Sequence, residues 1–401
     1  MIIGIIGAGA SGMAAALAAS QQPGVEVLLF ERQARVGRKL QATGNGRCNL
    51  TNLQPAAYHG DNAEFAAPAL ANYPPSETLQ WFSNLGLYTV VEDSGRVYPY
   101  SDQANSVVDV LRFALQKENI RLLTAVEVTK VRKDGKAFEI ISDGEAYRCD
   151  KLIIACGGLA GTKLGGSMSG YKLLRSFGHH CTRLRPALVQ IKSGWNGCVS
   201  LKGVRANCHV EIYNGDMRHS ASNGELQFTD YGLSGPVIFE TSRDVCQQPG
   251  NWFCRLDFLP DISRQMLLEL LMRKRSGEQP AEELLTGILH NRLGRVLTAS
   301  AGIRGQRSCQ SLTDAELEQV IDAVKSLEVD LTEPLGMDSA QVTAGGIVTD
   351  EFNPETMESR LVPGLYACGE VLDIDGDCGG YNLQWAWSSG RLAGSSAGGN
   401  T

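Results

Sequence analysis

The stretch Gly7-Ala8-Gly9-Ala10-Ser11-Gly12 decides the fold, because of what stands on either side of it. A short apolar run at residues 2–6 precedes it, and an alanine-rich run at residues 13–20 follows it. A second apolar run at residues 25–30 then ends at Glu31. Strand, glycine turn, helix and strand form a βαβ unit, and the acid at its end can accept hydrogen bonds from ribose hydroxyls. This combination is typical of dinucleotide-binding domains.

The residue types inside the motif have separate physical roles. Gly7 permits the tight turn, Gly9 lets the backbone approach a pyrophosphate, and Gly12 lets the helix pack closely on the strand. The N–H groups that open the helix, at Ala10 and Ser11, point toward the phosphates. The sequence therefore predicts a bound dinucleotide at the start of the chain.

The pattern of the remaining sequence divides the 401 residues into four parts. Residues 1–188 and 332–401 combine strand, helix and glycine-turn signals, which predict the two halves of one α/β domain. Residues 189–259 carry short β-rich runs and predict an inserted β-barrel. Residues 260–331 carry helical spacing and predict a small helical domain. Within the first part, residues 74–77 and 102–117 indicate helices, and residues 120–149 indicate a meander of three short strands.

The charge of the chain is uneven. Its net charge is −7, which argues against a protein that coats nucleic acid. Residues 151–210 nevertheless contain no Asp or Glu, which leaves the rest of the chain with 28 basic and 44 acidic residues and a charge of −16. This basic stretch indicates either a surface for an anionic ligand such as RNA or a solvated face paired with acids from elsewhere. Its cations are Lys151, Lys163, Lys172, Arg175, Arg183, Arg185, Lys192, Lys202 and Arg205.

Several classes of protein are disfavoured by composition. No window approaches the roughly 18 consecutive apolar residues of a membrane-spanning helix. The 11 cysteines have irregular spacings without a CxxC motif, so no zinc site, other metal site or disulfide framework is predicted. The apolar start lacks the basic region of a signal peptide. We therefore expect a cytoplasmic protein without membrane partners.

Two later blocks of the chain also contain several glycines. They read GRKLQATGNGRCNLTN at residues 37–52, and GLYACGEVLD with GGYNLQ at residues 364–373 and 379–384. Supporting strings are GRVYP at 95–99, GELQFT at 224–229, GLSGP at 232–236 and VTAGG at 342–346. Together these blocks resemble the BaiN/RdsA-type NAD(P)/FAD-dependent flavoproteins over most of the chain.

The resemblance implies a Rossmann-like, glutathione-reductase-like FAD-binding domain that carries an inserted β-barrel and a small helical domain. FAD is then the expected cofactor. Glu370, in the block at residues 364–373, would reach a hydroxyl of the cofactor. The helix that begins near residue 381 would direct its N–H groups at the flavin ring. Beyond the first motif and Glu31, the residues implied to bind FAD are Arg38, Lys39, Gly44, Asn45, Gly46, Arg47, Asn49, Val128, Ala155, Gly157, Gly369, Glu370, Gly380, Tyr381, Asn382 and Leu383.

Two residues in these blocks are candidates for catalysis, Cys48 and Tyr98, because both would lie beside the flavin. For Cys48 the alternative is a buried, inert thiol. A second dinucleotide motif is missing, since residues 157–161 lack the GxGxxG spacing. NAD(P)H would therefore bind only transiently as reductant, and disulfide reductases, which carry a second Rossmann domain and a redox cysteine pair, are excluded. The pair His179-His180 is expected to close a helix.

The expected activity is FAD-dependent, NAD(P)H-driven reduction of a conjugated C=C bond in a small substrate such as an unsaturated 3-oxo steroid, bile-acid-like compound or other enone. One alternative is reduction of ribosomal RNA uridine to dihydrouridine, with RNA bound by the basic stretch. Two others are a flavin amine oxidase and a flavin-bearing nucleic-acid module without redox activity. The acidic total charge favours the small molecule, because it would repel a polyanion.

Overall fold

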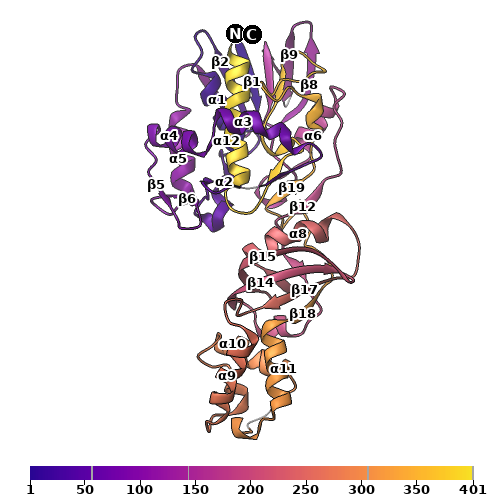
Figure 1. Cartoon of the computed structure of the whole chain (residues 1–401). Coiled ribbons are helices and arrows are strands. Elements are labelled where there is room, and N and C mark those ends of the chain that lie inside the picture. The colour runs from indigo at the N-terminus through magenta and orange to yellow at the C-terminus, as the bar shows by residue number, and fades with distance from the viewer. Residues whose placement is uncertain (56, 143, 305–306, 400–401) are drawn as a thin grey trace. The chain divides into compact units, whose positions relative to one another are not determined.

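A computed structural model describes residues 1–55, 57–142, 144–304 and 307–399 (Figure 1). The chain separates into two compact units: unit 1 comprises Met1–Arg185 and Ala340–Thr401, and unit 2 comprises Pro186–Ser339. Each unit has its own apolar core.

The central sheet of unit 1 is parallel, in the order β20-β11-β1-β2-β7. Its strands read as near-continuous apolar runs, because a parallel sheet is covered on both faces. Their bounds are Ile2–Ile6 for β1, Glu26–Glu31 for β2, Ile120–Thr124 for β7, Lys151–Ile154 for β11 and Leu365–Ala367 for β20. The sheet draws strands from both ends of the chain, which confirms the expected Rossmann-like α/β fold.

Smaller sheets surround this centre. An antiparallel meander consists of β8 (Val128–Asp134), β9 (Ala137–Ser142) and β10 (Glu145–Cys149). The prediction for residues 120–149 placed its first strand in this meander, whereas β7 joins the parallel sheet. Ala125, with φ of +56°, turns the chain between the two sheets. The other short strands of unit 1 are β3 (Thr51–Asn52), β4 (Tyr58–His59), β5 (Thr89–Val91), β6 (Arg96–Pro99), β19 (Val342–Ala344) and β21 (Asp375–Gly376).

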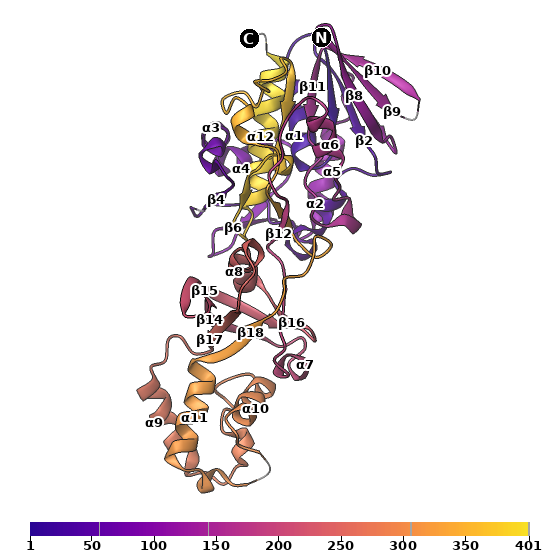
Figure 2. The same ribbon diagram turned by 90° about the vertical axis from the view of Figure 1, so that its right-hand side faces the viewer.

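Of the helices of unit 1, α1, α4, α5 and α12 lie where the sequence indicated helices, and α6 ends shortly before the His179-His180 pair that was expected to close a helix, whereas α2 and α3 were not predicted. The bounds are Ala10–Ala19 for α1, Arg38–Ala42 for α2, Ala67–Asn72 for α3, Pro75–Asn84 for α4, Ala104–Ala114 for α5, Ser169–Arg175 for α6 and Tyr381–Gly398 for α12. Helices α1 and α12 lie side by side in both views (Figures 1 and 2). Their contact is made by small residues: a Cβ on Gly390 would stand 2.3 Å from the Ser11 carbonyl oxygen, and one on Gly394 would stand 2.2 Å from that of Ala15.

Unit 2 combines an antiparallel sheet with helices. The sheet has the order β13-β16-β15-β14-β17-β18, and a bridge between Ile191 and Pro334 nearly closes it into a barrel. Its strands are β13 (Ile191–Lys192), β14 (Arg205–Asn214), β15 (Met217–Phe228), β16 (Gly232–Ser234), β17 (Trp252–Asp257) and β18 (Leu327–Leu331). Its helices are α7 (Gly197–Ser200), α8 (Pro236–Gln247), α9 (Arg264–Arg275), α10 (Asn291–Ser300) and α11 (Asp314–Lys325), and β12 (Arg185–Ala187) spans the boundary with unit 1.

One core joins the barrel strands and the helices of unit 2. Leu256 of β17 and Leu271 of α9 are both fully buried within it. The helix starts carry their own caps: the Ser263 hydroxyl accepts from the backbone of α9, and Thr313 with Glu316 forms a capping box on α11. The expected division of this region into barrel and helical domains at residue 260 stays a prediction.

Candidate functional site

The glycine motif forms an open cradle at the N-terminus of α1. Gly7 has φ of +104°, which glycine tolerates and other residues avoid. A Cβ on Gly12 would stand 1.8 Å from the Gly7 carbonyl oxygen, so the helix is as close to the turn as backbone permits. At Gly9, by contrast, a Cβ would meet nothing within 4 Å. The first-turn N–H groups around Ala10 and Ser11 therefore face space that a pyrophosphate fits.

Glu31 is fixed at the end of β2 by backbone donors. Its two carboxylate oxygens accept from the N–H of Ala8 at 3.0 Å and of Gln33 at 2.8 Å. The N–H of Val126 also bonds the Glu31 carbonyl at 3.0 Å, which brings the start of β8, with Val128, close to this corner. Carboxylate oxygens can accept more than one bond, so Glu31 keeps the capacity to bind a ribose hydroxyl. Nearby, Arg38 is exposed and donates to the Gln33 side chain at 3.0 Å.

The block at residues 364–373 reaches the block at residues 37–52 through Glu370. Its Oε2 pairs with Lys39 Nζ at 2.6 Å, and its Oε1 accepts from the Thr343 N–H at 2.9 Å. A Cβ on Gly158 would stand 2.4 Å from the same carboxylate, so only glycine fits there. A Cβ on Gly369 would stand 2.5 Å from Ser11 Oγ, which places this block against the first turn of α1.

The end of β11 lies at the same corner. The Ala155 N–H bonds the Ile6 carbonyl at 2.9 Å, so the two strand ends are adjacent. Gly157, with φ of +69°, follows in open space, since a Cβ there would meet nothing within 4 Å. Both residues thus lie beside the glycine motif, and their expected contact with FAD stays a prediction.

The loop that follows α2 has an unusual backbone. Gly44, Asn45, Gly46 and Cys48 all have positive φ, between +56° and +85°. A Cβ on Gly44 would crowd the Asn49 N–H at 2.8 Å, whereas Gly46 faces open space. Asn45 and Gly46 are exposed. This loop is therefore shaped for close approach of another group to its backbone.

Arg47 in this loop is held by other side chains. Its guanidinium bonds Asp102 and, at 2.9 Å, Glu92, and it stacks over the Tyr98 ring with 3.8 Å from Cζ to the ring centroid. Hydrogen bonds with Asp102 and then Glu92 raise its pKa. The structure thus directs Arg47 at Tyr98 and two carboxylates, and its expected contact with FAD stays a prediction.

The two candidate catalytic residues are both buried. Cys48 has no exposed surface, and burial raises the pKa of its thiol to about 12, against a small opposing effect of the Thr43 side chain. Burial also raises the pKa of Tyr98, whose side chain is 6% exposed. A thiol with such a pKa is a poor proton donor at neutral pH. The proton-donor role expected for Cys48 stays a prediction that its burial disfavours.

Gly379 and Gly380 open α12 with φ of +135° and +107°. A Cβ on Gly380 would stand 2.6 Å from the Thr51 carbonyl oxygen and 2.9 Å from Asn49 Oδ1. The Asn382 side chain ties this start to residue 376 by accepting from its N–H and donating to its carbonyl. The first-turn N–H groups, at Tyr381, Asn382 and Leu383, lack acceptors within the helix and carry its positive dipole end.

Arg96 in β6 was not singled out from the sequence, although the GRVYP string contains it. Among the described residues, no hydrogen bond or ion pair occupies its guanidinium. Its Nε lies 3.5 Å from the position of a Cβ on Gly379, so this cation stands next to the start of α12. An arginine directly after a glycine in a strand carries no distinctive spacing, and only the fold brings it to this place.

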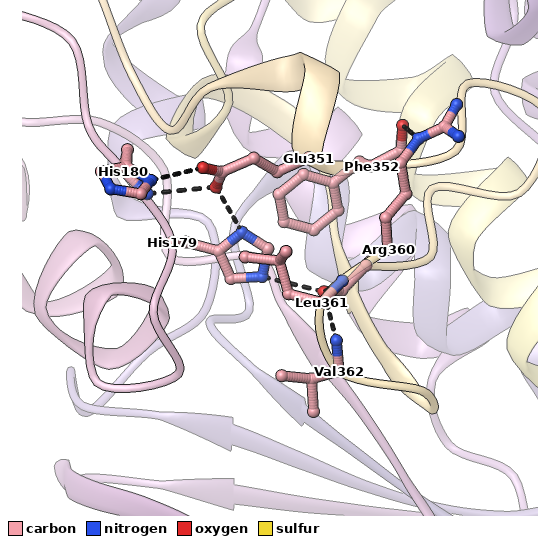
Figure 3. A network of polar contacts seen from close by, with 8 residues as sticks. His179, His180, Glu351, Phe352, Arg360, Leu361 and Val362 are labelled. Atoms are coloured by element: carbon pink, nitrogen blue, oxygen red, sulfur yellow. Dashed lines mark hydrogen bonds and ion pairs between the residues drawn. The ribbon is translucent and has the colours of Figure 1, made fainter.

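His179 and His180 form a network away from these residues (Figure 3). The buried His179 ring bonds Glu351 at 2.7 Å and the Ser359 hydroxyl at 2.9 Å, and it stacks on Phe352. His180, which is exposed, bonds the same carboxylate at 2.6 Å. This geometry has the parts of a serine–histidine–acid triad, but the Ser359 oxygen already accepts two backbone N–H groups, of Leu361 and Val362. The hydroxyl is therefore committed to the turn and is no nucleophile.

The basic stretch divides between the two units. In unit 2, its cations pair with acids: Lys192 with Glu333, Lys202 with Asp230 at 2.6 Å, and Arg205 with Glu225 at 3.4 Å. In unit 1, Lys163, Lys172 and Arg175 are exposed, and the described residues offer them no ion-pair partner. The stretch is therefore not one continuous unpaired surface.

Other kinds of site can be assessed for the part of the chain that the structure describes. No cluster of His, Cys, Asp or Glu has the arrangement of a metal site. Nor does any helix in those ranges have both the length and the apolar character needed to cross a membrane.

The residues present fit FAD. A Cβ at Gly9, Gly46 or Gly157 would meet nothing within 4 Å, so the backbone at each of these positions is open to another group. Glu31 keeps acceptor capacity for a ribose hydroxyl, and α12 presents a positive helix end. The buried Asn49 Oδ1, beside Gly380, has no hydrogen-bond partner among the described residues. The arrangement is that of an FAD-binding Rossmann domain.

Comparison with known proteins supports this assignment. Residues 1–396 match the family described as HI0933-like protein Rossmann domain. The chain is 40% identical to the 3-dehydro-bile acid delta(4,6)-reductase of Clostridium scindens, with 98% of each chain covered. It is 34% identical to the ribosomal RNA dihydrouridine synthase of Escherichia coli, covering 96% of this chain and 95% of that protein. The crystal structure of 3-ketosteroid delta1-dehydrogenase from Sterolibacterium denitrificans shares the fold, with 12% identity, a TM-score of 0.50 and 99% of each chain covered.

Proposed function

Because this chain belongs to the HI0933-like protein Rossmann domain family, we propose that it is an FAD-dependent oxidoreductase that reduces a conjugated C=C bond. The substrate class is an enone of the kind found in unsaturated 3-oxo steroids and bile acids. NAD(P)H is the proposed source of hydride. The amine-oxidase and non-redox alternatives have no supporting observation of their own.

One observation carries this proposal. The 40% identity to the bile acid delta(4,6)-reductase extends over 98% of both chains, so it includes both glycine-rich blocks as well as unit 2. No part of either chain that could carry the cofactor or substrate site is thus left out of the match. The reaction class is therefore proposed from the relative, and the site residues described above are proposed to support it.

Bound FAD would supply the chemistry of hydride acceptance and delivery. The chain's own residues would bind and orient it. The N–H groups that open α1 would hold the pyrophosphate, with Glu31 on the adenosine ribose. The positive end of α12, at Tyr381, would stabilise negative charge on the flavin ring. Lys39 would neutralise Glu370, so that this carboxylate stands near the phosphates without repelling them.

NAD(P)H is proposed to bind only for the time of hydride transfer. The stretch at residues 157–161 that follows β11 lacks the GxGxxG spacing, and its Gly158 packs against the Glu370 carboxylate. A second permanent dinucleotide site is thus not part of the proposal. The free cysteines of the described chain suit a reducing compartment, and we propose that the protein acts in the cytoplasm.

A second candidate is reduction of uridine in ribosomal RNA to dihydrouridine. It is favoured by the 34% identity to the Escherichia coli dihydrouridine synthase over nearly the whole chain. Exposed Lys163, Lys172 and Arg175 could contact phosphates. Against it stand the ion pairs of Lys192, Lys202 and Arg205, which cancel the basic character of the stretch in unit 2.

Two measurements separate these candidates. Purified holoprotein is reduced anaerobically with NADH or NADPH and then mixed with a panel of enones or with ribosomal RNA, while flavin absorbance is followed. Ribosomal RNA nucleosides from a deletion strain are analysed by mass spectrometry in parallel. Reoxidation by an enone, with unchanged dihydrouridine in the strain, supports the proposal. Loss of dihydrouridine without any reaction of enones would replace it with the RNA activity.

A further inference from the structure

The segment between the end of β2 and the first residue of α2 carries three arginines in the string RQARVGR at residues 32–38. Its backbone is fixed at both ends to the cofactor corner. The Gln33 N–H bonds the Glu31 carboxylate at 2.8 Å, and the Gly37 N–H bonds the Ala8 carbonyl at 3.0 Å. Residues 32–38 are named the arginine loop below. This loop thus lies beside the place where the ribose of FAD is proposed to bind.

The arginines of this loop have no carboxylate partner among the described residues. Arg32 donates from Nη2 to the Gly165 carbonyl at 2.6 Å, and Arg38 donates from Nη1 to Gln33 Oε1 at 3.0 Å. Arg35 is exposed and forms no hydrogen bond or ion pair within the described ranges. A guanidinium has five N–H donors, so most donors of all three side chains remain available to a ligand.

Two of the guanidiniums meet around the Gln33 side chain without an acid between them. A Cβ on Gly165 would stand 3.9 Å from Arg32 Nη2 and 4.0 Å from Gln33 Nε2, and the same amide accepts from Arg38. The nearest acid along the chain, Glu31, brings a single negative charge against the three positive charges of the loop. Like charges that are held close repel each other, and a bound anion removes that cost.

FAD offers no anionic group to Arg32 and Arg35. Its two phosphates are proposed to lie at the first turn of α1, and its ribose at Glu31. A carboxylate at that point accepts from a free ribose hydroxyl and would repel a phosphate on it, so an anion bound by the arginine loop belongs to a second molecule. The contact of Arg38 with FAD that the resemblance implies stays a prediction, and the inference therefore rests on the other two arginines.

NADPH carries an anion that fits this place. It differs from NADH only by a phosphate on the 2′-oxygen of the adenosine ribose, a group that arginine commonly binds. A dinucleotide that lies along FAD in the same direction has its adenosine near that of FAD, because both molecules consist of two halves joined by a pyrophosphate. Since residues 157–161 lack the spacing of a second dinucleotide motif, side chains outside such a motif must recognise the second molecule.

The phosphates of RNA fit the loop less well. A phosphate monoester carries about −1.5 to −2 charges at pH 7, whereas each phosphate of RNA is a diester with one. Binding of RNA therefore depends on many cations spread along a strand. Two arginines on one short loop match a single monoester instead.

We propose that Arg32 and Arg35 bind the 2′-phosphate of NADPH, with Arg38 adding positive charge, and that NADPH rather than NADH is the reductant. This inference rests on the proposed function. One hydride, with both of its electrons, passes from NADPH to bound FAD, and NADP⁺ leaves. The hydride then passes to the C=C bond, and one proton completes the product. The arginines take no part in these transfers, because they only select and orient the donor.

Binding of the phosphate is tested without turnover. The oxidised holoenzyme is titrated in a calorimeter with adenosine 2′,5′-bisphosphate and with adenosine 5′-phosphate, and the bisphosphate is expected to bind about tenfold more tightly. Arg35→Glu, which has no hydrogen bond to lose, should abolish this difference, and Arg35→Lys should keep part of it. Arg121→Glu, at an exposed arginine on β7, is the matched control. A bisphosphate that binds no more tightly than the monophosphate would overturn the inference.

Selection of the reductant is tested by anaerobic stopped flow with NADPH and with NADH, in the absence of an enone. The apparent Kd for NADPH should be the lower one in the unaltered holoenzyme. Arg32→Gln together with Arg35→Gln should raise the Kd for NADPH about 10–100-fold more than the Kd for NADH. The FAD content of each variant is measured in parallel. Loss of FAD from Arg35→Glu would assign the loop to the cofactor and overturn the inference.

The results distinguish this inference from the proposed function. If both nicotinamides reduce the flavin with equal Kd and the enzyme reduces enones, the inference fails and the function stands. If neither nicotinamide reduces the flavin, the proposed NAD(P)H-driven function fails and the inference with it. Weaker binding of single-stranded RNA by Arg35→Glu, with unchanged binding of the bisphosphate, would assign the loop to RNA and overturn the inference.

Discussion

Lys39 and Glu370 are 331 residues apart in the chain, and their side chains form an ion pair with 2.6 Å between Nζ and Oε2. The other carboxylate oxygen of Glu370 accepts from the Thr343 backbone. Lys39 therefore connects the block at residues 37–52 to the block at residues 364–373. A cation this close favours the charged form of the carboxylate and would offset its repulsion of a bound phosphate.

Lys39→Met should weaken FAD binding on the order of tenfold, because it leaves the Glu370 carboxylate without its cation. Adding Glu370→Gln to this variant should recover part of the loss, since the neutral amide no longer repels phosphate. Binding is measured by adding the apoprotein to free FAD and following the fall in FAD fluorescence. Lys172→Met, an exposed lysine on α6, is the control. Strictly additive losses in the double variant would show that the pair does not act as a unit.

Glu31→Ala should lower FAD retention by about 10–100-fold, or about 1.5–3 kcal/mol, by removing a charge-assisted hydrogen bond to the ribose. The loss also frees the N–H groups of Ala8 and Gln33. Glu31→Asp should be milder. Glu26→Ala, an exposed acid at the start of the same strand, serves as the control. Equal FAD content of Glu31→Ala and the unaltered protein after dialysis would place the ribose elsewhere.

Cys48 should be inert in the native protein. Its pKa is raised to about 12 by burial, so at pH 9 the folded thiol stays protonated while an unfolded thiol is substantially ionised. Stability from this group is therefore present below about pH 9 and lost as pH rises toward 12. Iodoacetamide at pH 9 followed by peptide mass spectrometry should label Cys48 only after denaturation. Cys48→Ala should keep kcat; a large loss of kcat with full FAD content would restore its proposed role as proton donor.

Acidification should destabilise unit 1 through His179. Burial lowers the pKa of His179 from its usual 6.5, with Glu351 opposing the shift. The stability from this group is present above pH 6.5 and is lost as pH falls further, because the unfolded chain then binds the proton more readily. Burial works to raise the pKa of Glu351, but its bonds with His180 and His179 lower it, so its own contribution is lost only below its usual 4.5.

In calorimetry, the Tm of the unaltered protein should therefore fall between pH 7.5 and pH 5. The Tm of His179→Gln should fall less over the same range. The same variant should be less stable at pH 7.5 by about 1–3 kcal/mol, since a buried hydrogen-bond network is broken. His180→Gln, whose ring is exposed, should keep the pH dependence. An unchanged slope in His179→Gln would mean that other groups dominate the acid transition.

If RNA is the substrate, neutralising Lys163, Lys172 and Arg175 together should lower the salt slope of RNA binding by about three units, because each lost phosphate contact removes roughly one. FAD content and NAD(P)H oxidation should not change. The matched control replaces Lys192, Lys202 and Arg205, which already pair with acids. If an enone is the substrate, neither triple variant should alter kcat/KM. Loss of flavin from the variant at Lys163, Lys172 and Arg175 would show that these three cations are structural.

The fold could be predicted from the sequence where the contacting residues lie close together in the chain. The βαβ unit is confirmed, with β1, α1 and β2 where the apolar and glycine runs lie, and the family resemblance is confirmed over residues 1–396. The assignment of residue 120 onward to the meander was wrong for β7. An apolar run of five residues fits either sheet, and only the turn at Ala125 separates them.

The site could be predicted less completely, because its contacts cross the whole chain. The sequence indicated Lys39 and Glu370 separately as FAD contacts, yet their pairing follows from the order of strands in the parallel sheet. Arg96 acquires its position only when β6 pairs with β3 and brings it to Gly379. The ion pairs of Arg47 and of the basic stretch likewise depend on acids that no local pattern reveals.

The glycine contact between α1 and α12 fixes the position of the two helices along their common axis. Gly390 meets Ser11, Gly394 meets Ala15 and Gly398 approaches Ala19, so the two helices run in the same direction in a fixed register. Helix α12 begins at Tyr381, nine residues before Gly390, whereas α1 begins at Ala10. At 1.5 Å per residue, their positive ends are offset by about 12 Å along the common axis. Any side chain at Gly394 would meet the Ala15 carbonyl oxygen at 2.2 Å and push the two helices apart, so the offset of their positive ends depends on glycine at this position.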